Sequence, residues 1–420
     1  MKGSLIKQNR KLRDLTLEGL SKGICSVSYL SKIENNTIQA SEKIYRLLGE
    51  RLGIRLIDIN QEFDEEIHQT LLSWHEASQL RDFTLMDHLK NKCEIALQEN
   101  HNIDLLNLFK VIAARHHMTK TNQLLDNGLY KELEGLLVNS TNEYQFFYHK
   151  VIGLHYFLKF ELKTASQHFL KSLSLLNQIS YNETEIYFHL SLTYSHTRQF
   201  VESNVYGKKA IEGYKKSLNY SKIVDSIMVI AINYNRMNAH TIAEKYFLDL
   251  LKMAKYQLKP LEKRRVFHNL GAIYIHQEKY DLAFDYLKRA SSIETDENIL
   301  KSNTTYLLAL TCYYNGDIEK SKEFLASGAV LAEKYNHIKY KHKLFTLKCR
   351  MNNTMHEDFF LQKLENQIIP DLKQSNDFED YRYFLELLAK LCFEKRLYKK
   401  SATYFKKANS INHSPKKDLL

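Results

Sequence analysis

The stretch from Thr16 to Asn36 carries side chains whose types and spacing suit contact with a DNA duplex. Thr16 and Ser26 can each cap the N-terminus of a helix, and Gly23 permits a tight turn between the two. Two short helices joined in this way form a helix-turn-helix. The second helix enters the major groove, while the first directs free amides at a phosphate. Small hydroxyls and one long cation suit groove contact, and the candidate DNA contacts are Thr16, Ser26, Val27, Ser28, Ser31, Lys32 and Asn36.

The flanking segments supply the rest of a small domain. An upstream segment and a downstream segment that ends at Gly53 each place leucine and isoleucine at helical spacing. We therefore expect four or five short helices that share one core over residues 1–60. This part of the chain has eleven Lys and Arg against six Asp and Glu, a net charge of +5. Such a balance is typical of a surface that faces phosphates.

The segment SKGICSVSYLSKIE, residues 21–34, resembles the Cro/repressor-type helix-turn-helix. It is closer still to the peptide-pheromone-responsive regulators of Gram-positive bacteria. Those regulators share the Ile-Cys pair, present here as Ile24 and Cys25, and a turn one residue shorter than the commoner repressor form. The resemblance implies that this module binds DNA. Leu17 and Val27 stand where polar groups often read bases in such modules, which leaves open a module that has lost its DNA affinity.

The composition limits the kinds of fold that the rest of the chain can adopt. A chain of 420 residues can hold several ordinary domains or one small domain and a long repeat array, and 3 Pro and 13 Gly permit long runs of helix. The net charge of +11 is spread unevenly, and the lysines near the C-terminus are typical of a solvated tail. Five cysteines lie far apart without metal-ligand spacing, so we expect a reduced, cytoplasmic protein without disulfides, metal or cofactor. We expect neither a secretion signal nor a membrane span.

Internal repeats organise the chain beyond residue 140. The clearest copy, residues 264–293, matches the tetratricopeptide pattern through Phe267, Leu270, Gly271, Tyr274, Tyr280, Ala283, Leu287 and Ala290. Further copies begin at residues 146, 184, 224, 302 and 382, with room for one worn copy near 342. The sequence therefore predicts an all-α fold. It has a helix-turn-helix domain over residues 1–60, a linker helix over 61–70 and a right-handed superhelical array of tetratricopeptide-like helical hairpins over 71–412.

The inner wall of such an array is a candidate binding surface. Stacked hairpins curl into a superhelix whose concave wall is built from the first helix of each pair. Asn can donate to and accept from an extended peptide backbone, and Arg can meet a carboxylate through paired hydrogen bonds. The candidate peptide contacts are Asn235, Arg236, Arg265, His268, Asn269, Asn303 and Tyr306, of which Asn269 is the strongest. Each could equally be an ordinary solvated polar residue.

A DNA-binding head joined to such an array resembles the quorum-sensing regulators that bind an imported short peptide, and is most similar to the neutral-protease regulators of bacilli. The resemblance implies a transcription regulator that binds double-stranded operator DNA as a homodimer or tetramer and is switched by a signalling oligopeptide. It also implies a possible second activity, connected with sporulation, in which the array sequesters a phosphorelay response regulator.

Two other functions remain open from the residues. The first is a protein-interaction scaffold for a response regulator, with DNA binding secondary or lost. The second is an enzyme that acts on an aspartyl-phosphate partner, which no catalytic constellation supports. His116 and His117 are adjacent and so diverge from a helix, whereas a metal pair needs a spacing of three or four. We therefore expect a protein that is not an enzyme.

Overall fold

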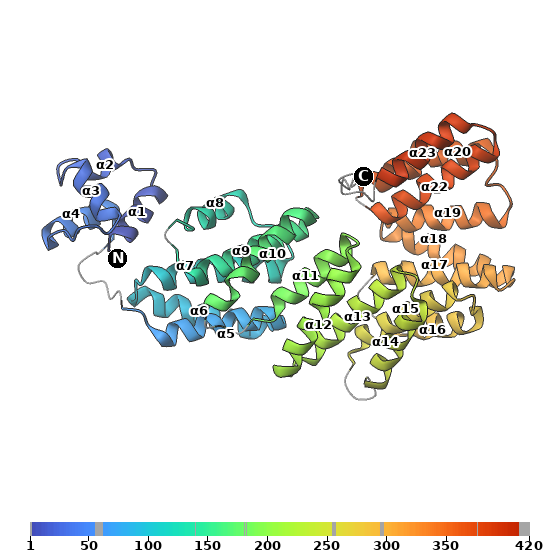
Figure 1. Cartoon of the computed structure of the whole chain (residues 1–420), viewed down its shortest axis with the longest axis horizontal. Helices are drawn as coiled ribbons and strands as arrows, with labels where there is room; N and C mark the ends of the chain where they lie inside the picture. The colour runs from blue at the N-terminus through green and yellow to red at the C-terminus, as the bar shows by residue number, and fades with distance from the viewer. Residues whose placement is uncertain are drawn as a thin grey trace, which may run out of the picture. The chain divides into compact units, whose positions relative to one another are not determined.

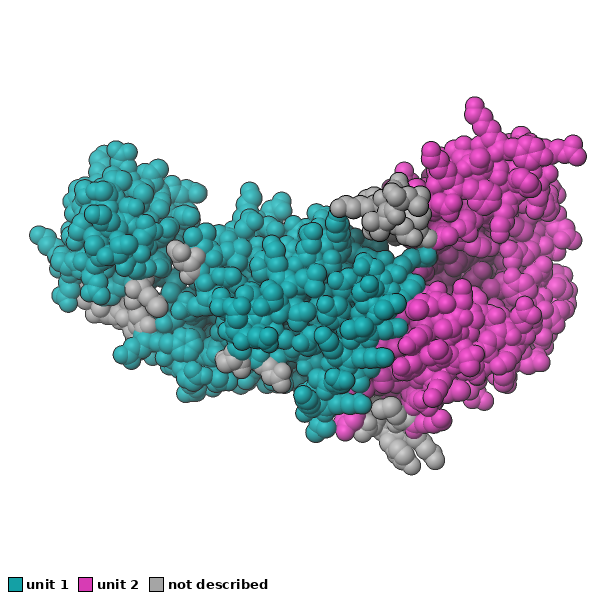
Figure 2. Space-filling model, viewed as in Figure 1, with its two compact units in different colours: residues 1–219 teal, residues 220–420 magenta. Residues whose placement is uncertain are grey.

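The computed structural model describes residues 2–54, 62–138, 140–179, 181, 183–253, 258–294, 298–375 and 377–410. Residues 55–61, where the expected linker helix begins, and the lysine-containing end from residue 411 lie outside this set. Figure 1 labels the helices, and Figure 2 shows the two compact units, residues 1–219 (unit 1) and residues 220–420 (unit 2).

Unit 1 begins with four short helices that form one small domain: α1 Lys2–Leu12, α2 Leu17–Ser21, α3 Val27–Glu34 and α4 Glu42–Leu52. Their shared core contains Leu5, Ile6, Leu20, Leu30, Ile33, Tyr45, Leu48 and Leu52. Arg10 joins α1 to α3, because its Nε and Nη2 donate to the two carboxylate oxygens of Glu34 at 2.7 and 2.9 Å. This bidentate ion pair fixes α1 against α3.

The turn between α2 and α3 forms as its residues predict. The Thr16 hydroxyl accepts a hydrogen bond from the Gly19 amide at 2.9 Å, and the Ser26 hydroxyl accepts one from the Tyr29 amide at 3.2 Å. Gly23 has a φ of 72°, a left-handed conformation that glycine adopts without steric cost. Local capping and one glycine therefore define the helix-turn-helix.

The rest of unit 1 consists of longer helices that share one large core. They are α5 Glu65–Leu80, α6 Phe83–Glu99, α7 Ile103–Thr121, α8 Asn127–Gly135, α9 Asn142–Leu158, α10 Leu162–Leu175, a 3₁₀ turn Leu176–Gln178, α11 Glu185–His196 and α12 Phe200–Lys216. Helices α9 and α10 form one hairpin, α11 and α12 form the next, and α5 and α7 pack together beside α9. The core runs continuously from α5 to α11.

Unit 2 continues the hairpin pattern. Its helices are α13 Tyr220–Arg236, α14 His240–Met253, α15 Pro260–His276, α16 Tyr280–Ser292, α17 Asn298–Tyr314, α18 Ile318–Lys334, α19 Ile338–Met351, α20 Asp358–Lys363, α21 Ile369–Gln374, α22 Phe378–Glu394 and α23 Tyr398–Ser410. The pairs α13/α14, α15/α16, α17/α18 and α22/α23 are hairpins. After α19 the second helix is interrupted, because a π-helical turn, Leu364–Ile368, separates α20 from α21.

Small residues set how closely paired helices approach. A Cβ added to Gly271 would lie 2.5 Å from Cγ of Leu287, and one added to Gly153 would lie 2.5 Å from Cε1 of Phe169. Only glycine leaves room for these large side chains at the crossing of the two helices.

Helices and their connecting turns make up the described residues, which contain no β-sheet. The predicted all-α class, a helix-turn-helix domain followed by an array of helical hairpins, is therefore confirmed.

Candidate functional site

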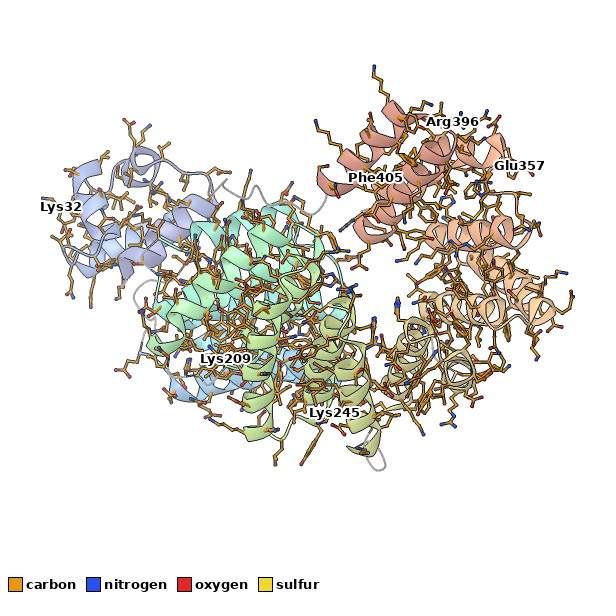
Figure 3. The ribbon with its side chains drawn as sticks, turned by 45° about the vertical axis from the view of Figure 1, so that its right-hand side comes forward. Lys32, Lys209, Lys245, Glu357, Arg396 and Phe405 are labelled. Carbon is orange, nitrogen blue, oxygen red and sulfur yellow. The ribbon has the colours of Figure 1, made fainter. Side chains whose placement is uncertain are left out.

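The N-terminal turn of α3 presents an exposed polar face. Ser26, Val27, Ser28 and Lys32 are exposed, while Ser31 is half-buried. Figure 3 shows Lys32 at the surface of the small N-terminal domain. No acidic side chain among the described residues pairs with the Lys32 ammonium, so its charge is available to a phosphate or a base edge. Thr16, at the start of α2, is exposed as well, although its hydroxyl already caps the Gly19 amide.

Asn36 differs from the other DNA-contact candidates. Its Oδ1 accepts a hydrogen bond from the Gly3 amide at 3.1 Å, and its Nδ2 donates to the Ser4 hydroxyl at 2.7 Å. The residue also has a φ of 54°, a conformation that asparagine tolerates better than most residues. These contacts tie the end of α3 to α1 and favour a structural role for Asn36.

The peptide-contact candidates lie on α13, α15 and α17, the first helices of three hairpins in unit 2. His268 is buried, and its pKa is lowered to about 4 because burial disfavours the imidazolium and the Arg264 charge repels it. Nδ2 of Asn303 lies 3.0 Å from Nε2 of His268 and can only donate, so Nε2 is the acceptor. Nδ1 therefore carries the proton and faces the Thr304 hydroxyl at 3.0 Å. His268 and Asn303 thus join α15 to α17.

Asn269 remains available to a ligand. It is half-buried, and its Nδ2 donates to the Arg265 carbonyl one turn earlier at 2.8 Å. No donor among the described residues reaches its Oδ1. A peptide amide could supply that donor.

The other candidates have protein neighbours. Oδ1 of Asn235 lies 2.8 Å from Nδ1 of His240, and Nη2 of Arg236 lies 3.4 Å from Oε1 of Glu379 on α22. The Arg236 pair joins the first hairpin of unit 2 to its last.

Two further candidates contribute charge and an aromatic ring to the same wall. Burial raises the pKa of Asp225 on α13, and the charges of Lys222 and of Arg265, which is half-buried on α15, partly oppose this rise. Tyr306 on α17 is half-buried, and Nζ of Lys343 lies 5.4 Å from the centre of its ring.

The sequence reasoning missed an ion-pair network on α19 and α22. Nζ of Lys339 lies 2.8 Å from Asp377 and 2.7 Å from Asp380, and Nζ of Lys343 lies 2.9 Å from Asp380. These helices hold the repeat copy with the weakest signature and the one that follows it. The spacing of the clearer repeat copies, extended through residue 340, could have indicated these residues.

The sequence reasoning also missed a buried charge cluster in unit 1. Nζ of Lys150, which has no exposed surface, lies 2.6 Å from Glu183, 2.8 Å from Glu185 and 3.0 Å from Nε2 of His75. Burial raises the pKa of Glu183, but Lys150 and His75 outweigh it and lower the pKa to about 2. Glu185 also meets Nη2 of Arg115 at 2.9 Å. Glu183 is therefore ionised at neutral pH, and the cluster links α5, α7, α9 and α11.

Other kinds of site find no support in the part of the chain that the structure describes. No group of three or more His, Cys, Asp or Glu side chains there is arranged to hold a metal ion. Among the described helices, none has both the length and the apolar character needed to cross a membrane.

Comparisons with known proteins match this architecture. The helix-turn-helix family matches residues 6–59, and the tetratricopeptide repeat family matches residues 265–297. Transcriptional activator NprA of Geobacillus stearothermophilus is 22% identical over 402 residues, which cover 92% of this chain and 97% of NprA. Regulatory protein RapD of Bacillus subtilis (strain 168) is 23% identical over 355 residues, which cover 82% of this chain and 99% of RapD.

Solved structures share the fold. The apo form of the quorum sensor NprR from B. thuringiensis matches with a TM-score of 0.70 at 19% identity, over 83% of this chain and 99% of that chain. NprR in complex with its cognate peptide NprX matches with a TM-score of 0.64 over the same shares of the two chains, also at 19% identity. The chain is thus a helix-turn-helix protein with a tetratricopeptide repeat array. It is similar in sequence to NprA and to RapD over most of their lengths, and it shares the fold of the quorum sensor NprR, as the predicted resemblance implies.

Proposed function

We propose that the chain is a transcription regulator whose helix-turn-helix binds operator DNA and whose repeat array binds a short signalling peptide. The observation that carries the proposal is that one chain contains both an exposed polar face on α3 and a repeat array that shares its fold with peptide-bound NprR. Asn269, whose amide oxygen has no donor among the described residues, is suited to the backbone of such a peptide.

Peptide binding can reach the DNA through the assembly. A peptide that binds one arrangement of the hairpins more tightly than another shifts the population toward that arrangement. A dimer or tetramer whose protomers pair through the array then changes the spacing of its DNA-binding heads. Two heads read two half-sites about 34–36 Å apart, or multiples of that distance, on a pseudo-palindromic operator.

Titration calorimetry tests the proposal. The full-length protein is titrated with synthetic peptides copied from the C-terminal end of any small secreted reading frame encoded immediately downstream of its gene, and with scrambled peptides of the same composition as controls. Saturable binding of one peptide per protomer, with a change in molecular mass or in operator affinity, is the expected result. Binding of native and scrambled peptides alike, or of neither, would count against a peptide receptor.

A second candidate function rests on the alignment with RapD, which spans nearly the whole of that protein. In this alternative, the peptide-free array sequesters a phosphorelay response regulator, and DNA binding is secondary or lost. Titration of the peptide-free protein with a purified response regulator distinguishes the two. Tight binding that the peptide reverses, without operator binding, supports the alternative, whereas operator binding without any response-regulator complex excludes it.

A further inference from the structure

Arg350, near the end of α19, connects three first helices of unit 2. Its Nη1 donates to the hydroxyl of Tyr314, the last residue of α17, at 3.0 Å. Its Nη2 donates to the hydroxyl of Tyr383 on α22 at 3.3 Å. First helices form the inner wall of a hairpin array, so the guanidinium lies on that wall.

The Arg350 charge has no carboxylate partner among the described residues. The two aspartates at the start of α22 are occupied, since Lys339 pairs with Asp377 and Asp380, and Lys343 pairs with Asp380. Arg236 is a useful contrast on the same wall, because its guanidinium already meets Glu379. Arg350 is therefore a half-buried cation whose two side-chain contacts are both uncharged hydroxyls.

This geometry suits a carboxylate. A guanidinium carries five N–H donors in a rigid plane, and two of them hold the tyrosine hydroxyls. The three that remain can donate to the two oxygens of a carboxylate side by side. Tyr314 and Tyr383 are 43% and 44% exposed, so both rings offer apolar surface to the atoms next to that carboxylate.

We propose that Arg350, positioned by Tyr314 and Tyr383, binds a carboxylate of the peptide ligand. The inference rests on the proposed function, because it assigns one contact of the same inner wall. The carboxylate is either the α-carboxylate at the peptide C-terminus or the side chain of an Asp or Glu. Arg350 lies outside the set of candidates that the repeat pattern indicated.

The test uses full-length protein and two random heptapeptide libraries, one with free C-terminal carboxylates and one with C-terminal amides. Bound peptides are sequenced by mass spectrometry, and individual peptides are then measured by calorimetry. The proteins are the wild type, Arg350→Gln and Lys348→Gln. Lys348 is an exposed cation on the same helix and serves as the matched control for loss of one positive charge.

The expected result is that wild type and Lys348→Gln select the same acidic peptides, and that Arg350→Gln binds them about tenfold to a hundredfold more weakly. Selection from the free-acid library alone identifies the α-carboxylate. Selection from both libraries, with Asp or Glu at one fixed position, identifies a side chain. In both cases the amide or Asn/Gln version of the peptide must bind wild type and Arg350→Gln equally. A purely structural role would instead weaken acidic and neutral peptides alike.

Two results would overturn the proposal. Equal selection and equal affinity in wild type and Arg350→Gln would remove Arg350 from the peptide site while leaving the proposed function intact. No selection by wild type from either library would remove the proposed function and this site with it. Tyr314→Phe and Tyr383→Phe, which keep the rings, should reduce the preference for acidic peptides without abolishing binding.

Discussion

Replacing Lys150 by methionine is expected to lower the free energy of unfolding of unit 1 by about 3–5 kcal/mol, because removing one member of a buried ion pair leaves the other charge uncompensated. Methionine fills a similar volume, so the loss is chiefly electrostatic. The Lys150 ammonium lies 2.6 Å from Glu183 and 2.8 Å from Glu185. Glu185 keeps the Arg115 cation, whereas Glu183 keeps His75, Gln79 and the backbone amide of Glu185.

The same substitution should reverse the pH dependence contributed by Glu183. In the wild type its folded pKa of about 2 lies below the ordinary value of 4.5, so its stabilisation is present above pH 4.5 and is lost as pH falls toward 2. Without Lys150, burial is the dominant effect and raises that pKa above 4.5. The resulting contribution is then present below pH 4.5 and is lost as pH rises. The difference in free energy of unfolding between the wild type and Lys150→Met should therefore be largest at pH 7 and smaller at pH 5.

Trp74, the only tryptophan of the chain, provides the assay. It is buried on α5 beside His75, and its Nε1 donates to Nδ1 of His116 on α7 at 2.9 Å, so its fluorescence reports on the helices around the cluster. With a urea m-value of about 2 kcal/mol/M, the midpoint should fall by about 1.5–2.5 M.

The matched control is Lys92→Met, which removes an exposed pair with Glu66 and should cost less than about 1 kcal/mol. An unchanged midpoint in Lys150→Met, or a deficit that grows on acidification, would refute the reasoning.

The other predictions concern DNA, peptide, acid and packing. Lys32→Ala should weaken operator binding, and in a salt titration a phosphate-contact role would lower the slope by about one, whereas unchanged affinity and selectivity would place Lys32 outside the interface. Asn269→Ala should weaken peptide binding by about 1–3 kcal/mol in calorimetry and leave the fold intact. The pKa of His268 is about 4 in the folded protein and 6.5 ordinarily, so on acidification the unfolded chain takes up the proton before the folded protein does. As the pH falls from 7 to 5, this group should therefore lower the stability measured by denaturant titration by about 2 kcal/mol. Gly271→Ala should lower the thermal midpoint, because its Cβ would overlap Leu287, at a cost of about 1–3 kcal/mol.

Several features of this chain could be predicted from the sequence because their causes are local. The caps at Thr16 and Ser26 act over three residues, and the left-handed turn at Gly23 depends on one. The contact of Gly271 with Leu287 lies within a single hairpin. Residue types at short spacing therefore sufficed for the all-α class and for the exposed position of Lys32 on α3.

Only the tertiary structure shows which polar side chains already have protein partners. His268 and Asn303, both plausible ligand contacts by their helix positions, bond to each other across 35 residues. Arg350 meets tyrosines 36 and 33 residues away, and Lys150 meets a histidine 75 residues away. A side chain's type states what it can bond, but which partner reaches it depends on how distant helices stack. For this reason the sequence by itself determined the helices and the face of α3, whereas the stacking of the hairpins decided which polar groups on the inner wall remain open to a ligand.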